Sequence, residues 1–228
     1  MTVVVMVLLP GVIALGLWQL DRGAQKRVLE TAYLNKLTAL PLPVAEAPLD
    51  EAFQRVVLHG EFIEQIFLVD NQVVEGVIGY WVVQGFVDKA GTKYLVNRGF
   101  VPASTSRSEL PDVNAPAGMV KVIGVVWPFT GLIPVLDEDA WQPGWPKRVQ
   151  RLDVARMANK TGAKAVELRL EPGQPGVTIA APFATVLSDA QHKGYAATWF
   201  GLAVALVLSY AIFGFKSGAT QLLPKDNN

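Results

Sequence analysis

Two long apolar stretches, one near each end of the chain, dominate its hydrophobic pattern. Residues 3–20 form an uncharged run of 18 positions, and residues 195–215 form a second run of 21. At a rise of about 1.5 Å per residue, such runs approach or match the roughly 30 Å hydrocarbon layer of a membrane. Tyr195 and Trp199 open the second run, and aromatic rings are enriched at that depth. The pattern predicts two transmembrane helices.

A cleaved signal peptide is the alternative explanation of the first run. The run is long for a signal peptide, and residues 18–22 (WQLDR) stand where small residues would mark a cleavage site. We therefore expect a retained anchor. No Lys or Arg precedes the run, which leads us to expect that the natural protein starts upstream of Met1.

Residues 21–194 separate the two runs and have the charge of a solvated domain. They carry 18 basic and 19 acidic side chains. Residues 21–37 are rich in helix formers and should extend the first helix, until Pro41 and the prolines after it end the helix. Residues 216–228 form a short tail. The loop is too long for the positive-inside rule, so charge counting leaves the orientation open.

The middle of the chain changes to short runs of β-branched and aromatic residues bounded by Gly, Asn and Asp. These runs predict strands over residues 55–62, 65–70, 79–87, 93–98, 120–127, 166–170 and 177–180. Residues 88–92 are expected to form a hairpin connection. Asp153 as N-cap and Gly162 after the last turn predict a short helix over residues 153–161.

The fold class that follows is α+β, with a β-rich, barrel-like antiparallel domain enclosed between two transmembrane helices. Residues 128–147 are rich in proline and include Trp141 and Trp145. A loop of this length and composition should cover part of the domain or lie on the membrane.

Composition excludes several classes of function. The chain has no cysteine, which removes disulfide frameworks, thiolate metal sites and covalent haem attachment. Its formal net charge is zero without a basic block, which argues against nucleic acid as a partner. No nucleophile motif, phosphate-binding loop or paired-carboxylate site is present, so we do not expect an enzyme. Its two histidines are His59 and His192, and His59 is expected to be an ordinary strand residue that is exposed or makes a local hydrogen bond.

His192 is the candidate ligand because of its position at the mouth of the second span. Both inner ends of the spans meet the central domain, so Trp18, Gln19 and Arg22 share a membrane layer with His192, Tyr195 and Trp199. The helix dipole and partial burial disfavour the imidazolium, and neutral imidazole is the form that binds iron. A haem could lie there, with its ring against the aromatic side chains and its propionates near Arg22 or Lys193.

The alternative interpretation is an aromatic belt with a solvent-facing histidine. In that case Arg22 follows Trp18 by one turn only to make a cation–π contact. Spacing alone leaves both interpretations open.

The chain resembles the surfeit-locus family of cytochrome c oxidase assembly factors, and the resemblance covers nearly its whole length. The motifs that carry it are residues 16–22 (GLWQLDR) with Lys26, 60–62 (GEF), 76–80 (GVIGY), 95–102 (LVNRGFVP) and 192–200 (HKGYAATWF). The departures are small: Phe100 stands where the family often has Trp, and Gln25 where it often has an aromatic residue.

The resemblance implies a multi-pass protein of the bacterial inner membrane, with the central domain in the periplasm and a cytoplasmic tail. It also implies transient binding of haem a, with His192 as the iron ligand. Trp18, Tyr195 and Trp199 would then form the rim of the site, and Arg22 is the candidate propionate partner. Subunit I of cytochrome c oxidase is the expected partner, haem A synthase a second candidate, and membrane lipid surrounds the helices.

A second hypothesis is a cofactor-free scaffold that stabilises an assembly intermediate of an oxidase subunit. In that case the loop around Trp141 and Trp145, together with exposed strand edges, would matter more than His192.

Overall fold

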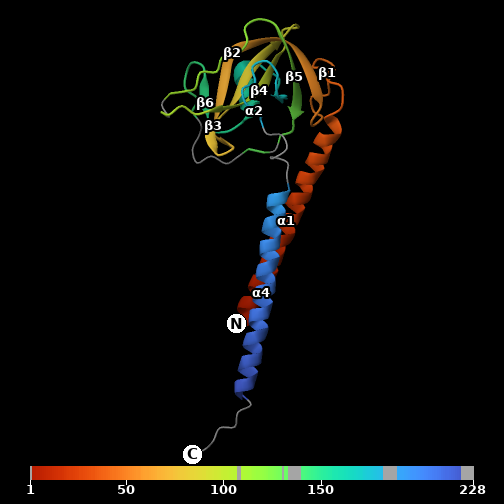
Figure 1. Cartoon of the computed structure of the whole chain (residues 1–228), viewed down its shortest axis with the longest axis vertical. Helices are drawn as coiled ribbons and strands as arrows, with labels where there is room; N and C mark the ends of the chain where they lie inside the picture. The colour runs from red at the N-terminus through yellow and green to blue at the C-terminus, as the bar shows by residue number, and fades with distance from the viewer. Residues whose placement is uncertain (1, 107–108, 130, 133–139, 182–188, 222–228) are drawn as a thin grey trace, which may run out of the picture. The chain divides into compact units, whose positions relative to one another are not determined.

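The computed structural model of the protein describes residues 2–106, 109–129, 131–132, 140–181 and 189–221, with residues 216–221 described by their backbone alone. The chain divides into two compact units. The first combines Met1–Thr31 with Ala184–Asn228, and the second is Ala32–Phe183. A pair of long helices makes up the first unit, and the second is β-rich (Figure 1).

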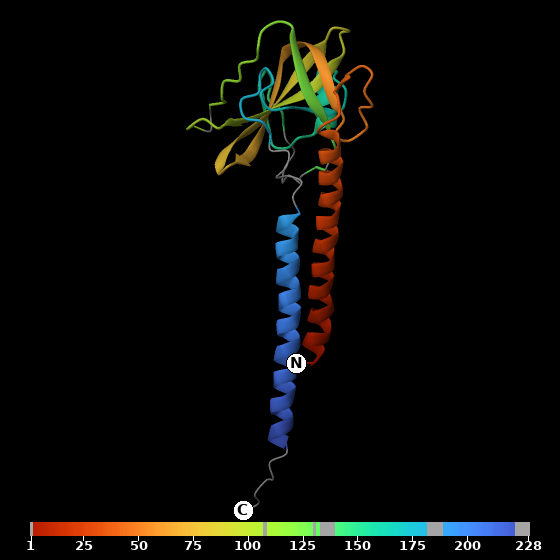
Figure 2. The same ribbon diagram turned by 45° about the vertical axis from the view of Figure 1, so that its right-hand side comes forward.

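The helix pair consists of α1 (Thr2–Lys36) and α4 (Ala190–Gln221), both long and apolar enough to cross a membrane. The two helices lie side by side and run in opposite directions (Figure 2). At one end the Thr2 and Tyr210 hydroxyls are 3.2 Å apart, and at the other Arg27 pairs with Asp189. The predicted extension of the first helix beyond its apolar run is confirmed, because α1 continues without a break to Lys36.

The contact between α1 and α4 follows one seam. Buried and half-buried positions repeat at spacings of three and four residues, which is typical of left-handed helix pairs. They are Val5, Leu9, Val12, Gly16, Gln19 and Gly23 on α1, and His192, Ala196, Trp199, Ala203 and Leu206 on α4. Small residues recur along this seam and allow close approach of the backbones. A Cβ atom added at Gly16 would lie 2.7 Å from Cε1 of Phe200.

Five strands of the second unit close into a ring. In order of pairing they are β2 (Arg55–Val74), β3 (Val77–Asp88), β4 (Lys93–Pro102), β7 (Glu167–Leu170) and β5 (Val120–Trp127). Each strand pairs with the next, and β5 pairs back with the first part of β2. All of these pairs are antiparallel except β4–β7. The predicted α+β class, with a barrel-like domain flanked in sequence by two apolar helices, is confirmed.

Smaller elements complete the barrel unit. The strands β1 (Leu42–Pro43) and β6 (Lys147–Val149) each run parallel to β2. The helix α2 (Val154–Thr161) packs Met157 and Ala158 into an apolar cluster on the barrel. As predicted, Asp153 caps this helix by accepting a hydrogen bond from the backbone N–H of Arg156, and Gly162 ends it in the left-handed conformation.

Strand predictions from the local sequence pattern differ from the structure at three places in the barrel unit. The two strands predicted over residues 55–62 and 65–70 form the single strand β2, with an irregular register between Phe62 and Ile66. The strand predicted over residues 177–180 is wrong, because only Ile179 pairs, in an isolated bridge to Phe100. The short strands β1 and β6 were not predicted.

The tryptophan-rich loop covers part of the barrel, which was one of its two expected roles. The rings of Trp141 and Trp145 lie 5.3 and 5.1 Å from the ring of Phe67, between centroids. Residues 130 and 133–139 of this loop lie outside the described residues.

Candidate functional site

His192 lies on the first turn of α4, at the seam with α1. Its Nδ1 atom is 2.8 Å from Oε1 of Gln19. An amide oxygen can only accept a hydrogen bond, so this contact corresponds to the tautomer of neutral imidazole that carries its proton on Nδ1. In that tautomer Nε2 carries an unprotonated lone pair, and Nε2 has no hydrogen-bond partner within the described ranges.

Three residues of α4 surround His192 in the pattern that its helical spacing predicts. Ala196 and Trp199 continue the seam, with Ala196 buried and Trp199 half-buried. Tyr195 lies off the seam and exposes 50% of its surface. The small residue Ala196 thus follows His192 by one helical turn, and the aromatic residues Tyr195 and Trp199 lie on either side of it along α4.

Trp18 and Arg22 occupy the neighbouring surface of α1. Trp18 is 50% exposed, and the guanidinium carbon of Arg22 lies 5.7 Å from the centroid of the indole ring. Arg22 also donates a hydrogen bond of 3.0 Å to Oε1 of Gln25. The cation–π contact expected under the alternative interpretation is therefore present, and Arg22 remains exposed to solvent.

Helix geometry places these side chains on one flank of the pair. A helix turns about 100° per residue, so Trp18 and Arg22 lie to the same side of Gln19. Tyr195 has the same offset of three residues from His192 that Arg22 has from Gln19. The two helices face each other and run in opposite directions. Residues that follow Gln19 on α1 and His192 on α4 by the same number of positions therefore lie on the same side of the seam, which we call a flank. His192 therefore borders a flank that carries two half-exposed aromatic rings and one cation.

The opposite flank carries an ion cluster. Nη1 of Arg27 and Nζ of Lys193 lie 2.6 and 2.8 Å from Oδ2 of Asp189, whose side chain is 12% exposed. Hydrogen bonds from Lys193 and then Arg27 hold the pKa of the Asp189 carboxyl below its usual value. Lys193, one of the two propionate partners considered from the sequence, is thus already paired, which leaves Arg22 as the better candidate.

The donor set of this region fits a haem better than a bare metal ion. The described part of the chain contains no cluster of three or more His, Cys, Asp or Glu side chains that could hold a metal. A single imidazole with a free Nε2 suits an iron whose other ligands come from a porphyrin. The exposed aromatic flank suits an apolar macrocycle, and the residues present therefore fit the group.

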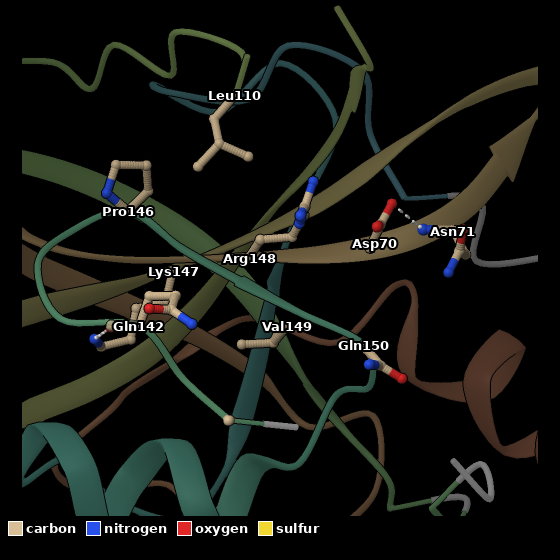
Figure 3. A pocket seen from close by; sticks show the side chains of 10 residues that line it. Asp70, Asn71, Leu110, Gln142, Pro146, Lys147, Arg148, Val149 and Gln150 are labelled. Atoms are coloured by element: carbon tan, nitrogen blue, oxygen red, sulfur yellow. Dashed lines mark hydrogen bonds between the residues drawn. The ribbon is translucent and has the colours of Figure 1, made fainter. Parts of the chain in front are cut away.

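The barrel unit offers no comparable site in the residues described. His59 is exposed on β2 opposite Lys121, as predicted. A cavity of about 750 Å³ opens beside β6 and is lined by Asp70, Gln142, Arg148 and neighbouring residues, without a histidine (Figure 3). It therefore offers no imidazole to an iron.

Arg98, a motif residue, has a structural role in the barrel. Its guanidinium is almost fully buried and donates hydrogen bonds to the carbonyls of Gly176 and Asn114 and to Oε1 of Gln84. Burial lowers the pKa of Arg98 to about 10, so the group stays charged at neutral pH. The cation ties two loops to the barrel wall.

Gln19 is the residue that sequence reasoning missed. It was placed in the same membrane layer as His192 but given no role, because spacing along one helix does not fix how two helices are rotated toward each other. One signal in the sequence could have found it. Among the α1 positions from Val5 to Gly23 that repeat every three or four residues along the seam, Gln19 is the one with a polar side chain.

Fold and site together define a membrane protein with two apolar helices, a barrel domain between them in the sequence, and a histidine at the helix seam. The model of the SURF1 family matches residues 6–204, and the chain belongs to this family. It is 29% identical to Surfeit locus protein 1 of Takifugu rubripes over 215 residues, which cover 84% of this chain and 87% of that protein.

Two further relatives come from a mammal and a bacterium. Surfeit locus protein 1 of Homo sapiens is 27% identical over 214 residues, which cover 84% of this chain and 70% of the human protein. A SURF1-like protein of Rickettsia felis is 26% identical over 232 residues, covering 92% of this chain and 95% of that protein. Family membership and the two apolar helices together assign this chain to a membrane.

Proposed function

We propose that the protein is an assembly factor for cytochrome c oxidase that holds haem a as cargo and passes it to subunit I. The observation that carries the proposal is the state of His192. Its Nδ1 lies 2.8 Å from Oε1 of Gln19, its Nε2 has no hydrogen-bond partner among the described residues, and it borders an aromatic flank of the helix pair. The proposal is also supported by the membership of the chain in the SURF1 family, because the resemblance to that family implies this role.

Each side chain of the flank has a separate task in holding the cargo. His192 would bind the haem iron through Nε2. Trp18, Tyr195 and Trp199 contact the apolar ring, and Arg22 pairs with a propionate. A carrier must also release its cargo, and one imidazole on an open flank binds more weakly than an enclosed site with two ligands. The chain needs no catalytic group for this task.

The proposed setting is a bacterial inner membrane, with the barrel in the periplasm and the tail in the cytoplasm. Bacterial SURF1-like relatives support a bacterial membrane setting. Subunit I receives the haem, and haem A synthase is the candidate donor. Alkaline phosphatase fused within the barrel unit and green fluorescent protein fused to the tail would both be active in this orientation.

The test is the reduced-minus-oxidised visible spectrum of the detergent-purified protein, made in cells that also synthesise haem a. Wild type should carry a haem a band that is lost in His192→Ala. The matched control is His59→Ala, since His59 is the other histidine of the chain and lies exposed on the barrel. Equal haem in wild type and His192→Ala, or none in either, would refute the proposal.

The scaffold function remains the alternative, and one observation favours a specific surface for it. The tip of the β2–β3 hairpin exposes three apolar side chains, Val73, Val77 and Ile78, at 62%, 47% and 59%. Trp141 and Trp145 instead pack on Phe67, so the hairpin tip is the better docking surface. Serine at all three tip positions should block oxidase maturation if the scaffold function holds, while His192→Ala should leave maturation intact.

A further inference from the structure

The hydrogen bond between the two helices has a consequence for the chemistry of His192. Oε1 of Gln19 lies 2.8 Å from Nδ1, and both residues lie on the seam, where neighbouring side chains limit their rotation. Neutral imidazole has two tautomers, and a fixed acceptor at Nδ1 favours the one with its proton there.

We infer that Gln19 is the positioning residue of the site: it holds His192 in the Nδ1–H tautomer and aims the unprotonated Nε2 at the ligand. The inference rests on the proposed function for the identity of the ligand, but the tautomer is a property of the protein alone. Partners of this kind orient ligating histidines in metal sites and increase their basicity.

The packing around the pair explains why a glutamine suits this position. A Cβ atom added at Gly23, one turn after Gln19, would lie 3.5 Å from Cβ of His192, so the backbone of α1 comes close to the histidine. A neutral amide can span the remaining distance and accept the Nδ1 proton. It adds no charge at the membrane surface, whereas a carboxylate would add one.

The first test needs no haem. The protein contains two histidines, so uniform ¹⁵N-histidine labelling gives two rings, and a His59→Asn variant assigns them. In detergent at alkaline pH, the ¹⁵N chemical shifts of His192 should show a protonated Nδ1 and an unprotonated Nε2 in wild type. Gln19→Leu should give a mixture of tautomers. A wild-type ring that is protonated on Nε2, or is equally mixed, would overturn the inference.

The second test measures the effect on the ligand. Gln19→Leu should weaken haem retention by about 10- to 100-fold, the range typical of lost hydrogen-bond partners to metal ligands. The resonance Raman iron–histidine stretch of the reduced protein should fall in Gln19→Leu and rise in Gln19→Glu, because a carboxylate pulls harder on the Nδ1 proton. The matched control is Gln191→Leu, since Gln191 is exposed beside His192 on α4.

The outcomes separate the inference from the proposed function. If the tautomer is as expected but wild type binds no haem, the proposed function fails and the tautomer assignment stands. If wild type binds haem and neither the affinity nor the stretch changes in Gln19→Leu, the positioning role is wrong while the proposed function survives. A loss in Gln191→Leu equal to that in Gln19→Leu would also overturn the positioning role.

Discussion

The barrel unit and the helix pair use their motif residues in opposite ways. In the barrel, Gly60 and Gly79 let paired strands lie close together, since a Cβ at either would collide with the carbonyl oxygen of Val87 or Val101. Arg98 is likewise buried and fully engaged. In the helix pair, Trp18 and Tyr195 are half exposed, and Nε2 of His192 has no partner among the residues described. Similar motifs therefore serve folding in one unit and leave groups available for binding in the other.

The largest effect that would test this comparison is expected from Gly60→Ala. The collision is with backbone, which no side-chain rotation relieves, so we expect a loss of roughly 3–5 kcal/mol in unfolding free energy. Thermal unfolding followed by near-ultraviolet circular dichroism measures it. Gly91→Ala is the control: its φ is +83° with open space around it, so it should cost only about 1–2 kcal/mol. Equal losses in the two variants would refute a role of Gly60 in the close approach of the paired strands.

Arg98→Met should have the next largest effect. The substitution keeps much of the side-chain volume but leaves the carbonyls of Gly176 and Asn114 and the buried Gln84 amide oxygen without this donor. We expect a loss of about 2–3 kcal/mol in stability, with haem content per folded molecule unchanged. Lys89→Met, at an exposed position, should leave both unchanged. If Arg98→Met instead removes haem from protein that melts normally, the division of roles between the two units is wrong.

A smaller effect is expected in the helix pair from Gly16→Ile. The added side chain meets the Phe200 ring, and we expect it to weaken helix packing by about 1–2 kcal/mol. Because the chain has no cysteine, a Thr2→Cys/Tyr210→Cys pair reports helix contact by cross-linking in membranes with a short bis-maleimide, which spans the space that the tyrosine side chain fills. Gly11→Ile should leave cross-linking unchanged, since nothing lies within 4 Å of a Cβ there. The melting of the barrel should be unaffected by either substitution.

Much of the fold could be predicted because its signals are local. The two apolar runs, the 88–92 connection and the capped helix α2 depend on residues close together in sequence. The strands β1 and β6 could not be predicted, because their two or three residues are held by parallel pairing with distant parts of β2. The predicted strand over residues 177–180 failed for the same reason: its β-forming residues find a partner only at Ile179.

The candidate site shows the same limit. Connectivity was enough to place Trp18, Arg22 and His192 in one layer, because both inner helix ends join the central domain. It could not provide the rotation of α1 against α4, which makes Gln19 the partner of His192. That rotation follows from Gly16, Gly23, Ala196 and Ala203, whose small size matters only once the two helices meet.

The smallest effect distinguishes the two flanks of the helix pair. Arg22→Gln should weaken haem retention about threefold, because an exposed ion pair contributes under about 1 kcal/mol. Lys193→Gln should change it less, since Lys193 lies on the opposite flank and is paired with Asp189. Haem transfer from each variant to apomyoglobin gives the comparison. If Lys193→Gln released haem faster than Arg22→Gln, the propionates would lie on the flank of the ion cluster, and Trp18 and Tyr195 would lose their assigned role.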